Sequence, residues 1–375
     1  MLCTRRQFCR QMGVCLGVSL TTPHYFNRLF SQTVASAQPY IREARYYVKL
    51  ADGKIRCLLC PRACVVPDGK RGYCRVRENQ NGVYKTLVYG RLCTLNNDPI
   101  EKKPLFHFLP GTNALSVATA GCNLKCKFCQ NWNISQVTPE ELPFEYTTPE
   151  KLISLAKKYQ TPTIAFTYTE PTISTEYICD TAGIARKNGL HSVMISNGYI
   201  NPEPLKDLCG VLSAIKIDFK AYSEQFYRDV TDGTLLPVLE TLKQIKHSKI
   251  WLEIVNLVIP TQNDDPTQIR QMSQWILQNL GPDVPVHFTR FHPLYLMQNL
   301  PPTSIGTLEA AYDIARETGL KFVYIGNVPG HAAENTYCPH CQRKIIERIG
   351  YQLRSLSIKN GKCQYCQTII PGVWS

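Results

Sequence analysis

The chain has 375 residues, more than one average domain needs, so we expect one large domain with smaller modules. Apolar residues make up 44% and charged residues 19%, which excludes a largely disordered protein. No apolar stretch approaches the roughly 20 residues of a membrane span, and the net charge of +13 favours anionic partners.

The first 37 residues have the pattern of a twin-arginine export leader. Arg5 and Arg6 precede a modestly apolar run from Met12 to Leu20, and Ala35-Ser36-Ala37 offers a small-residue cleavage site. The alternative is a disordered basic tail. The pattern predicts export of the folded protein to the periplasm, and a cytoplasmic location if the leader does not function. We leave this segment out of the fold prediction.

Residues 38–110 form the first expected module, which carries four closely spaced cysteines. Thiols a few residues apart converge on one point, which suits a metal ion or cluster better than disulfides. Zinc would make this site structural, whereas an iron–sulfur cluster could relay electrons. The small loop-rich unit that the last cysteine closes favours zinc. The four cysteines are Cys57, Cys60, Cys64 and Cys74.

Residues 111–330 alternate short apolar runs with helical patterns. Such runs, bounded by turn residues, indicate buried parallel strands, and the helices between them indicate repeated βαβ units. Thr148-Pro149 supplies a helix cap and an N1 proline. The expected strands are Ala114–Ala120, Thr163–Thr169, His191–Asn197, Ala214–Phe219, Trp251–Ile259, Pro285–Phe291 and Lys321–Gly326. The expected helices are Glu150–Gln160, Ile173–Lys187, Pro266–Asn279 and Leu308–Glu317, the last three ended by Gly189, Gly281 and Gly319.

Six or seven strands are fewer than the eight of a closed barrel, so we expect an open, partial β/α barrel. A doubly wound sheet is the alternative. In either architecture the functional site lies at the carboxyl ends of the strands. Polar residues gather where these runs stop, as that rule predicts: they are Glu170, Ser196, Asn197, Asp218, Lys220, Arg290 and His292.

Three cysteines follow the first of these strands, in the spacing Cys122-x3-Cys126-x2-Cys129. A cube of iron and sulfur usually takes four cysteines, one for each iron. Three on one loop would leave one iron to a non-protein ligand. A zinc site that borrows Cys93 or a distant histidine is the alternative, although this spacing is not typical of zinc ligands.

This three-cysteine loop resembles that of the radical S-adenosylmethionine (SAM) superfamily. The segment from Gly121 to Trp132, Gly-Cys-Asn-Leu-Lys-Cys-Lys-Phe-Cys-Gln-Asn-Trp, is closer still to the radical SAM member of the AmmeMemoRadiSam system, a group similar to pyruvate formate-lyase-activating enzymes. The resemblance runs from about Lys54 to the C-terminus. It implies a [4Fe–4S] cluster whose open iron chelates SAM and whose electron cleaves the sulfonium. The resulting 5′-deoxyadenosyl radical then takes hydrogen from a substrate.

The resemblance also implies contacts to SAM. Phe128 is similar to an aromatic that packs on adenine. Glu170, in Tyr-Thr-Glu-Pro, stands where activating enzymes have Gly-Gly-Glu-Pro and meet the SAM amino group; both glycines are replaced. Ser196-Asn197 stands in a segment that often reads Asp-Thr-Asn-Gly, here without the aspartate. The remaining expected contacts are Asp218 with Lys220, which resembles a lysine that pairs with the SAM carboxylate, and His292, which resembles a histidine near the ribose. An ion-pair set at the barrel mouth is the alternative role for Glu170, Asp218 and Lys220.

Residues 331–375 carry two cysteine pairs typical of a zinc ribbon. Four thiolates suit tetrahedral zinc, which supplies most of the folding energy of so small a unit. Its expected role is structural or partner docking. The ligands are Cys338, Cys341, Cys363 and Cys366.

Three functions compete on these features. A radical SAM enzyme would need an external one-electron donor and would act on a substrate, for which a protein or an AmmeMemo-system partner is one option. An iron–sulfur electron-transfer protein without SAM chemistry would have fully protein-ligated clusters. A zinc-ribbon protein that binds nucleic acid would use the positive charge, but the lysines and arginines outside the leader are dispersed along the chain.

Overall fold

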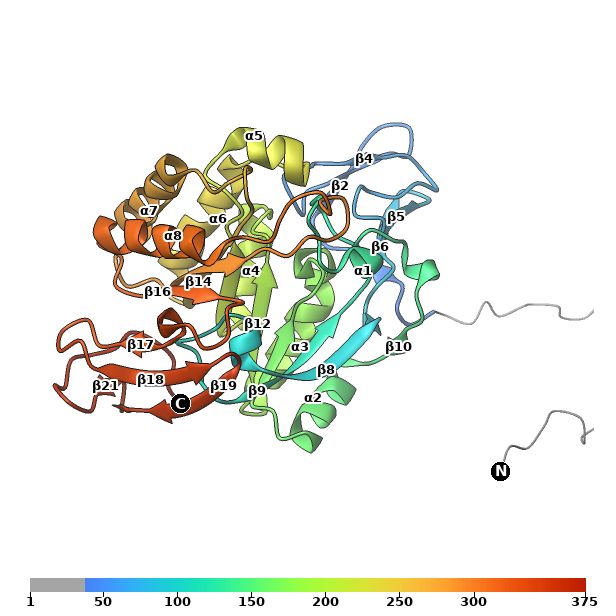
Figure 1. Cartoon of the computed structure of the whole chain (residues 1–375). Coiled ribbons are helices and arrows are strands. Elements are labelled where there is room, and N and C mark those ends of the chain that lie inside the picture. The colour runs from blue at the N-terminus through green and yellow to red at the C-terminus, as the bar shows by residue number, and fades with distance from the viewer. Residues whose placement is uncertain (1–37) are drawn as a thin grey trace, which may run out of the picture. The chain divides into compact units, whose positions relative to one another are not determined.

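Seven parallel strands and one antiparallel strand form the central sheet of the structure, a computed structural model that describes residues 38–375 (Figure 1). The strand order is β16-β15-β14-β13-β12-β11-β9-β8. The sheet does not close, because β16 and β8 each pair with only one neighbour in it. The parallel strands are β9 (Asn113–Ala118), β11 (Thr163–Phe166), β12 (His191–Ser196), β13 (Ala214–Asp218), β14 (Trp251–Val258), β15 (Val286–Arg290) and β16 (Val323–Gly326).

Each of the seven expected apolar runs corresponds to one of these strands, and every neighbouring pair among them is parallel. The expected α/β arrangement is therefore confirmed. The leader expected over residues 1–37 lies outside the described residues. In the described part of the chain, no helix is both long enough and apolar enough to cross a membrane.

The eighth strand, β8 (Thr94–Pro99), is one that the sequence did not indicate. It pairs antiparallel with β9 along the edge of the sheet. Its sequence, Thr-Leu-Asn-Asn-Asp-Pro, is mostly polar and ends in proline. An edge strand tolerates both features, because one side of it needs no ladder hydrogen bonds and one face can meet solvent.

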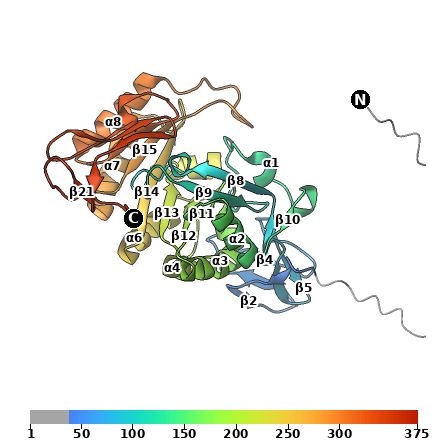
Figure 2. The ribbon, with the colours of Figure 1, turned by 90° about the horizontal axis from the view of Figure 1, so that it is seen from below.

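Six helices run along the outer side of the curved row of strands (Figure 2). The expected cap of the first is confirmed, since the Thr148 side chain accepts a hydrogen bond from the backbone nitrogen of Lys151 and Pro149 is the first helical residue. Gly319 ends the last with φ of +111°. The helices are α2 (Pro149–Lys158), α3 (Thr175–Lys187), α4 (Pro202–Val211), α6 (Leu236–Ser248), α7 (Pro266–Leu280) and α8 (Ile305–Thr318).

Short helical turns connect these elements. One of them, the π-helical segment Tyr227–Thr231, follows α5 (Glu224–Phe226) and contacts the three-cysteine loop. The others are α1 (Trp132–Ser135) and the 3-10 turns η1 (Ile100–Lys102), η2 (Pro139–Glu141), η3 (Pro171–Ser174) and η5 (Ala332–Glu334).

The N-terminal part of the described chain is built from small antiparallel sheets (blue in Figure 1). One contains β1 (Arg42–Glu43), β6 (Val83–Thr86) and β5 (Arg77–Gln80), and another contains β2 (Tyr47–Lys49), β3 (Ile55–Cys57) and β4 (Val65–Val66). A two-stranded pair, β7 (Arg91–Leu92) with β10 (Glu145–Tyr146), follows along the chain.

The C-terminal part packs against the barrel through a core of its own. Phe106, Phe322 and Tyr324 from the barrel side join Ile345 and Ile346 in this buried cluster. Its two sheets (red in Figure 1) contain β17 (Thr336–Tyr337), β18 (Lys344–Ile349) and β19 (Gln352–Leu356), and β20 (Ile358–Lys359) and β21 (Lys362–Cys363).

Candidate active site

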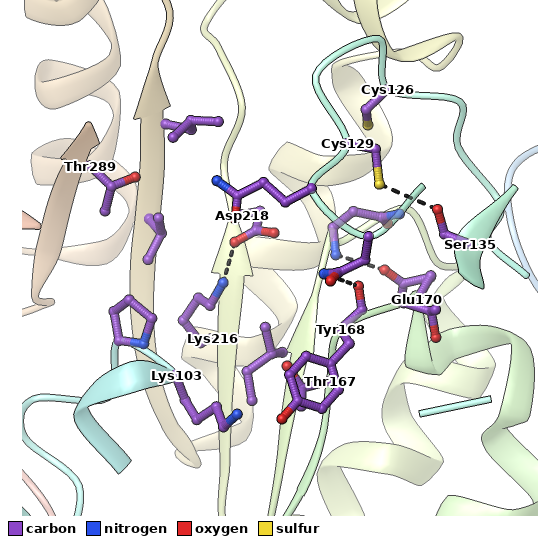
Figure 3. A pocket seen from close by; sticks show the side chains of 18 of the residues that line it. Lys103, Cys126, Cys129, Ser135, Thr167, Tyr168, Glu170, Lys216, Asp218 and Thr289 are labelled. Carbon is purple, nitrogen blue, oxygen red and sulfur yellow. Dashed lines mark hydrogen bonds and ion pairs between the residues drawn. The ribbon is translucent and has the colours of Figure 1, made fainter. Parts of the chain in front are cut away.

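A cavity of about 460 Å³ lies inside the barrel (Figure 3). Its walls include Lys216 and Asp218 of β13, Val255 and Leu257 of β14, and Thr289 of β15. Residues two apart on a strand point to the same face, so these side chains face away from the outer helices. The volume is within the range of small-molecule sites.

The three-cysteine loop forms one end of this cavity, and Cys122, Cys126 and Cys129 all line it. Backbone hydrogen bonds fasten the loop to the π-helical segment: the nitrogens of Lys125 and Lys127 donate to carbonyls there, both at 2.9 Å. The loop begins at Gly121, where the backbone passes close to Cys74. Gly121 has φ of +92°, and a Cβ there would lie 2.6 Å from the carbonyl oxygen of Cys74. Only glycine fits this position without a shift.

The surroundings of the three sulfurs suit thiolates that carry a cluster. The backbone nitrogen of Leu124 lies 3.4 Å from the Cys122 sulfur, Asn197 Nδ2 lies 3.9 Å from it, and Cys129 lies 3.3 Å from the Ser135 hydroxyl. Donors of this kind stabilise cluster sulfurs. Burial raises the pKa of the Cys126 thiol to about 11, although Lys220 opposes this. A metal would therefore be needed to hold these groups as thiolates near neutral pH.

The donor set fits a cluster with one open iron. Among the residues that the structure describes, no fourth cysteine lines the cavity. Cys93, the ligand considered for a zinc alternative, instead directs its thiol to the Ala118 carbonyl at 3.5 Å. The group that could hold a single metal ion in the described chain lies elsewhere, at four C-terminal cysteines whose sulfurs are all within 4.8 Å of one another. Single zinc ions need such close spacing, whereas a cluster with one cysteine per iron holds its ligands farther apart.

Glu170 is held in place beside the loop by three hydrogen bonds. Its Oε1 accepts from the Ser196 hydroxyl at 2.8 Å and from the backbone nitrogen of Thr172 at 3.0 Å, and its Oε2 accepts from the backbone nitrogen of Asn197 at 2.8 Å. Burial raises the pKa of Glu170, and these donors oppose the shift. A carboxylate has about four acceptor positions, so one position on Oε2 is left for a ligand.

Asp218 and Lys220 lie on the opposite wall. Lys220 Nζ is 3.7 Å from Asp218 and 5.3 Å from the ring centre of Phe128. Lys216, two residues before Asp218, also bonds to this carboxylate. Burial alone would raise the pKa of Asp218, but Lys216 and Lys220 overcome it and hold the pKa below its usual value. The pair is therefore charged and faces the cysteines.

Most of the expected site residues come together here. The cysteines, Phe128, Glu170, Asn197, Asp218 and Lys220 all line the cavity. Ser196 does not, and instead supports Glu170 from behind. His292 is exposed and does not line the cavity.

Three lysines in the cavity escaped sequence reasoning: Lys102, Lys103 and Lys216. Lys103 lies at the end opposite the cysteines (Figure 3). Lys103 was missed because it follows η1, which comes directly after the unrecognised strand β8. Lys216 could have been found from the sequence. In Ala-Ile-Lys-Ile-Asp it is the other polar residue on the face that carries Asp218, inside an otherwise apolar strand.

The four C-terminal cysteines gather into one compact group. Their sulfurs all lie within 4.8 Å of one another, with 3.5 Å between Cys338 and Cys366 and 3.8 Å between Cys341 and Cys363. Four sulfurs at about 2.3 Å from one zinc ion would be about 3.8 Å apart, so this group could hold a single metal ion.

The N-terminal cysteines also share one neighbourhood, next to the three-cysteine loop. Cys57 donates a backbone hydrogen bond to the Cys64 carbonyl at 2.9 Å, and Cys74 makes the close approach to Gly121. Arg62 donates to the Asn123 carbonyl at 2.6 Å, and its guanidinium lies 3.4 Å from the Tyr73 ring centre.

Comparison with known proteins agrees with this geometry. Residues 116–272 match the model of the radical SAM superfamily. The chain is 48% identical over 328 residues to the uncharacterized protein MJ0808 of Methanocaldococcus jannaschii, spanning 87% of this chain and 98% of that protein. It is 21% identical over 182 residues to the pyruvate formate-lyase-activating enzyme of Clostridium pasteurianum, spanning 46% of this chain and 73% of that enzyme.

Among solved structures, a domain of a pyruvate-formate lyase-activating enzyme from Bacteroides vulgatus aligns with a TM-score of 0.40 and 15% identity. The alignment covers 44% of this chain and 98% of that one. This likeness is too distant to carry an argument about function.

Proposed function

The chain belongs to the radical SAM superfamily and is related to glycyl-radical activating enzymes, and from that premise we propose that the three-cysteine loop holds a [4Fe–4S] cluster beside a SAM site. One observation carries the proposal: the three thiols share a cavity with Glu170, Asp218 and Lys220. A cluster bound there would pass one electron to SAM, giving methionine and a 5′-deoxyadenosyl radical that takes hydrogen from a substrate.

The protein's share of this chemistry is binding, orientation and exclusion of water. The free acceptor position on Glu170 Oε2 suits the ammonium group of SAM, since the other positions are filled by Ser196, Thr172 and Asn197. Lys220 has a side chain only 11% exposed and keeps donors for a carboxylate, because its contact with Asp218 is long at 3.7 Å. Phe128 offers a buried aromatic face next to Lys220. These groups are in place before any ligand arrives, which lowers the cost of ordering them.

For the substrate, we propose a role like that of the activating enzymes, with a protein as one class of substrate. The support is the relationship to two such proteins, the enzyme of Clostridium pasteurianum and a putative glycyl-radical enzyme activating enzyme of Methanocaldococcus jannaschii, 25% identical over 138 residues. Membership of the AmmeMemoRadiSam system is part of the same proposal and rests on the sequence around Cys122–Cys129. An external one-electron donor is required.

We propose zinc for the C-terminal group Cys338, Cys341, Cys363 and Cys366, supported by its sulfur spacing. For the N-terminal group we propose a metal site as well. Zinc would make the site structural, whereas an iron–sulfur cluster could relay electrons. Metal analysis of the purified chain separates the two, because a second cluster doubles the iron content and leaves a single zinc.

The test of function is anaerobic reconstitution with iron and sulfide, followed by SAM and a strong reductant and assay for 5′-deoxyadenosine. The intact chain should form it, and Cys126→Ala should lose both the iron assigned to that loop and the product while keeping zinc. Cys93→Ala is the matched control, since Cys93 lies outside the cavity and should be dispensable. A fully loaded chain that yields no 5′-deoxyadenosine, or an active Cys126→Ala variant, would overturn the proposal.

We also propose that the leader directs export. Its support is the sequence pattern alone. Fractionation of cells that express an Arg5→Lys/Arg6→Lys variant tests it, because loss of twin-arginine export should leave the variant in the cytoplasm while the parent chain reaches the periplasm.

A further inference from the structure

At the end of the cavity away from the cysteines, two lysines share one carboxylate. Lys102 and Lys103 both reach Asp98, with N–O distances of 2.9 and 2.5 Å. The side chain of Lys103 is 2% exposed. Two cations therefore share one anion, and one of them is almost completely removed from water.

The same arrangement recurs on β13, where Lys216 and Lys220 both contact Asp218. The side chain of Lys216 is 5% exposed. Lys102 is 44% exposed and Lys220 faces the proposed SAM site, so the two buried lysines are Lys103, which pairs with Asp98, and Lys216, which pairs with Asp218. Each of these two ammonium groups has three N–H donors and one carboxylate partner, and both line the cavity. Buried donors without acceptors are costly, so a ligand that supplies anionic oxygens would be stabilised here.

The other acidic groups nearby do not accept hydrogen bonds from Lys103 or Lys216. Glu170 accepts from three donors at the cluster end. Glu253, the register partner of Lys216 on β14, is buried; it accepts from the backbone nitrogens of Phe106 and His107 at 3.0 and 2.8 Å and lies 2.8 Å from His287. The spare donors of Lys103 and Lys216 therefore remain available to a ligand.

Tyr168 completes this end at a cost in backbone strain. Its φ is +66°. Glycine adopts this conformation readily, whereas in other residues it costs about 1 kcal/mol or more. Its carbonyl accepts from Asn131 Nδ2 at 2.9 Å, its hydroxyl bonds to Asp98, and its ring centre lies 4.5 Å from Lys103 Nζ. The strained backbone thus places an aromatic side chain against the buried lysine.

We propose that Lys103 and Lys216 form a subsite that binds the carboxylate or phosphate of a small organic substrate. The inference rests on the proposed function, because the subsite faces the SAM site across one cavity. Burial lowers the pKa of Lys103 to about 8, Asp98 opposes the shift, and Lys102 and Lys216 add to it. The charge of Lys216 therefore repels the charge of Lys103, and an anion between the two would reduce this repulsion.

The test measures anion binding to the cluster-loaded chain, saturated with SAM and without reductant so that Lys220 is occupied. Inorganic phosphate and acetate are titrated by calorimetry. The tighter of the two identifies the group that the subsite accepts. Lys103→Gln and Lys216→Gln should each weaken binding by about tenfold, the contribution of one hydrogen bond to a charged group. Lys321→Gln, which removes a surface lysine paired with Asp283, should leave it unchanged.

Two measurements of folding guard against loss through misfolding. The far-UV circular dichroism spectrum and the iron content of Lys103→Gln and Lys216→Gln should match those of the parent chain. If neither probe binds the parent chain, or if the two lysine variants bind as tightly as the parent, the subsite is disproved. Formation of 5′-deoxyadenosine without substrate is measured in parallel. The parent chain should form it whether or not an anion binds, so failure of the subsite and failure of the radical SAM assignment give different results.

Discussion

The guanidinium of Arg77 and the carboxylate of Glu176 lie 2.5 Å apart, with side chains 0% and 5% exposed. Arg77 belongs to β5 in the N-terminal part and Glu176 to α3 of the barrel. Arg77 also donates two hydrogen bonds to the Ile173 carbonyl, at 3.1 and 3.2 Å. This contact fixes the N-terminal cysteines beside the loop that starts at Gly121, so the geometry of both cysteine groups depends on it.

Removing one partner of this pair should be strongly destabilising. Arg77→Met leaves the Glu176 carboxylate buried without its cation, and we expect the free energy of unfolding to fall by about 3–5 kcal/mol. Urea denaturation followed by far-UV circular dichroism measures the change. The control is Arg45→Met, because Arg45 pairs with Asp180 on the surface, at 48% and 38% exposure, where such pairs contribute at most about 1 kcal/mol. Equal losses in the two variants would contradict this role for Arg77.

Removing metal from the C-terminal group should loosen that part of the chain alone. The four sulfurs are placed for one ion, and chelation takes away the cross-link that they share. Hydrogen exchange should then speed up in β18 and β19, while β13 in the barrel keeps its protection. Cys363→Ala should reproduce the effect without a chelator, and Cys209→Ala, in α4, should not. Unchanged exchange in β18 after complete zinc removal would exclude a structural role for the ion.

The barrel could be predicted because its strands are buried on both faces. Runs such as Thr163–Thr169 are rich in apolar and β-branched residues, and glycines such as Gly319 end the helices between them. β8 escaped because an edge strand needs no apolar pattern and tolerates Pro99. Lys103 was missed for the same reason, because the local sequence Lys102-Lys103-Pro104 does not indicate that the chain turns into the barrel there.

The site was predictable to the extent that its residues stand at strand ends. Glu170 and Asp218 follow that rule, and both line the cavity. No sequence pattern predicts the position of Tyr168 in the cavity. Its backbone is left-handed, and its side chain contacts Asp98, which is 70 residues away in sequence. Contacts between residues so far apart produce no periodic pattern in the sequence.

Glu170→Gln should weaken SAM binding while leaving the barrel folded. The amide has the size of the carboxylate but carries no charge. Its NH2 group would also face hydroxyl and backbone N–H groups that are themselves donors. We expect affinity for SAM to fall by tenfold or more, about the effect of losing one charge-assisted hydrogen bond. Equilibrium dialysis with the cluster-loaded chain measures it. Ser196→Ala removes only one supporting hydrogen bond and should cost less.

The pH dependence of SAM binding follows from the same residue. Burial raises the pKa of Glu170, although the three donors oppose the shift, so protonation begins at a higher pH than for an exposed glutamate. Because the ammonium of SAM needs the charged carboxylate, affinity should fall as pH decreases through that range. Glu170→Gln should lose this dependence. A variant that keeps the parent pH profile would assign the titration to another group.

Lys103 should make the stability of the folded chain rise with pH in the alkaline range. Burial lowers its pKa to about 8 from the usual 10.5, with Asp98 opposing the shift and Lys102 and Lys216 adding to it. Between these two values the unfolded chain binds the proton and the folded chain has released it, so raising the pH favours folding. The full effect is about 3 kcal/mol, from a shift of 1.36 kcal/mol per pKa unit. Below the folded pKa, the cost of the buried charge is constant.

The measurement is the free energy of unfolding as a function of pH for the parent chain and for Lys103→Gln. The difference between them should shift in favour of the parent as pH rises from about 8 toward 10.5. Lys102→Gln serves as the control, because Lys102 is 44% exposed and shares Asp98 without being buried. Anion binding should weaken over the same range, since neutral Lys103 no longer attracts a carboxylate or phosphate. A stability difference that does not change with pH would show that Lys103 keeps an ordinary pKa, and the buried positive charge at this end of the cavity would then need another balancing group.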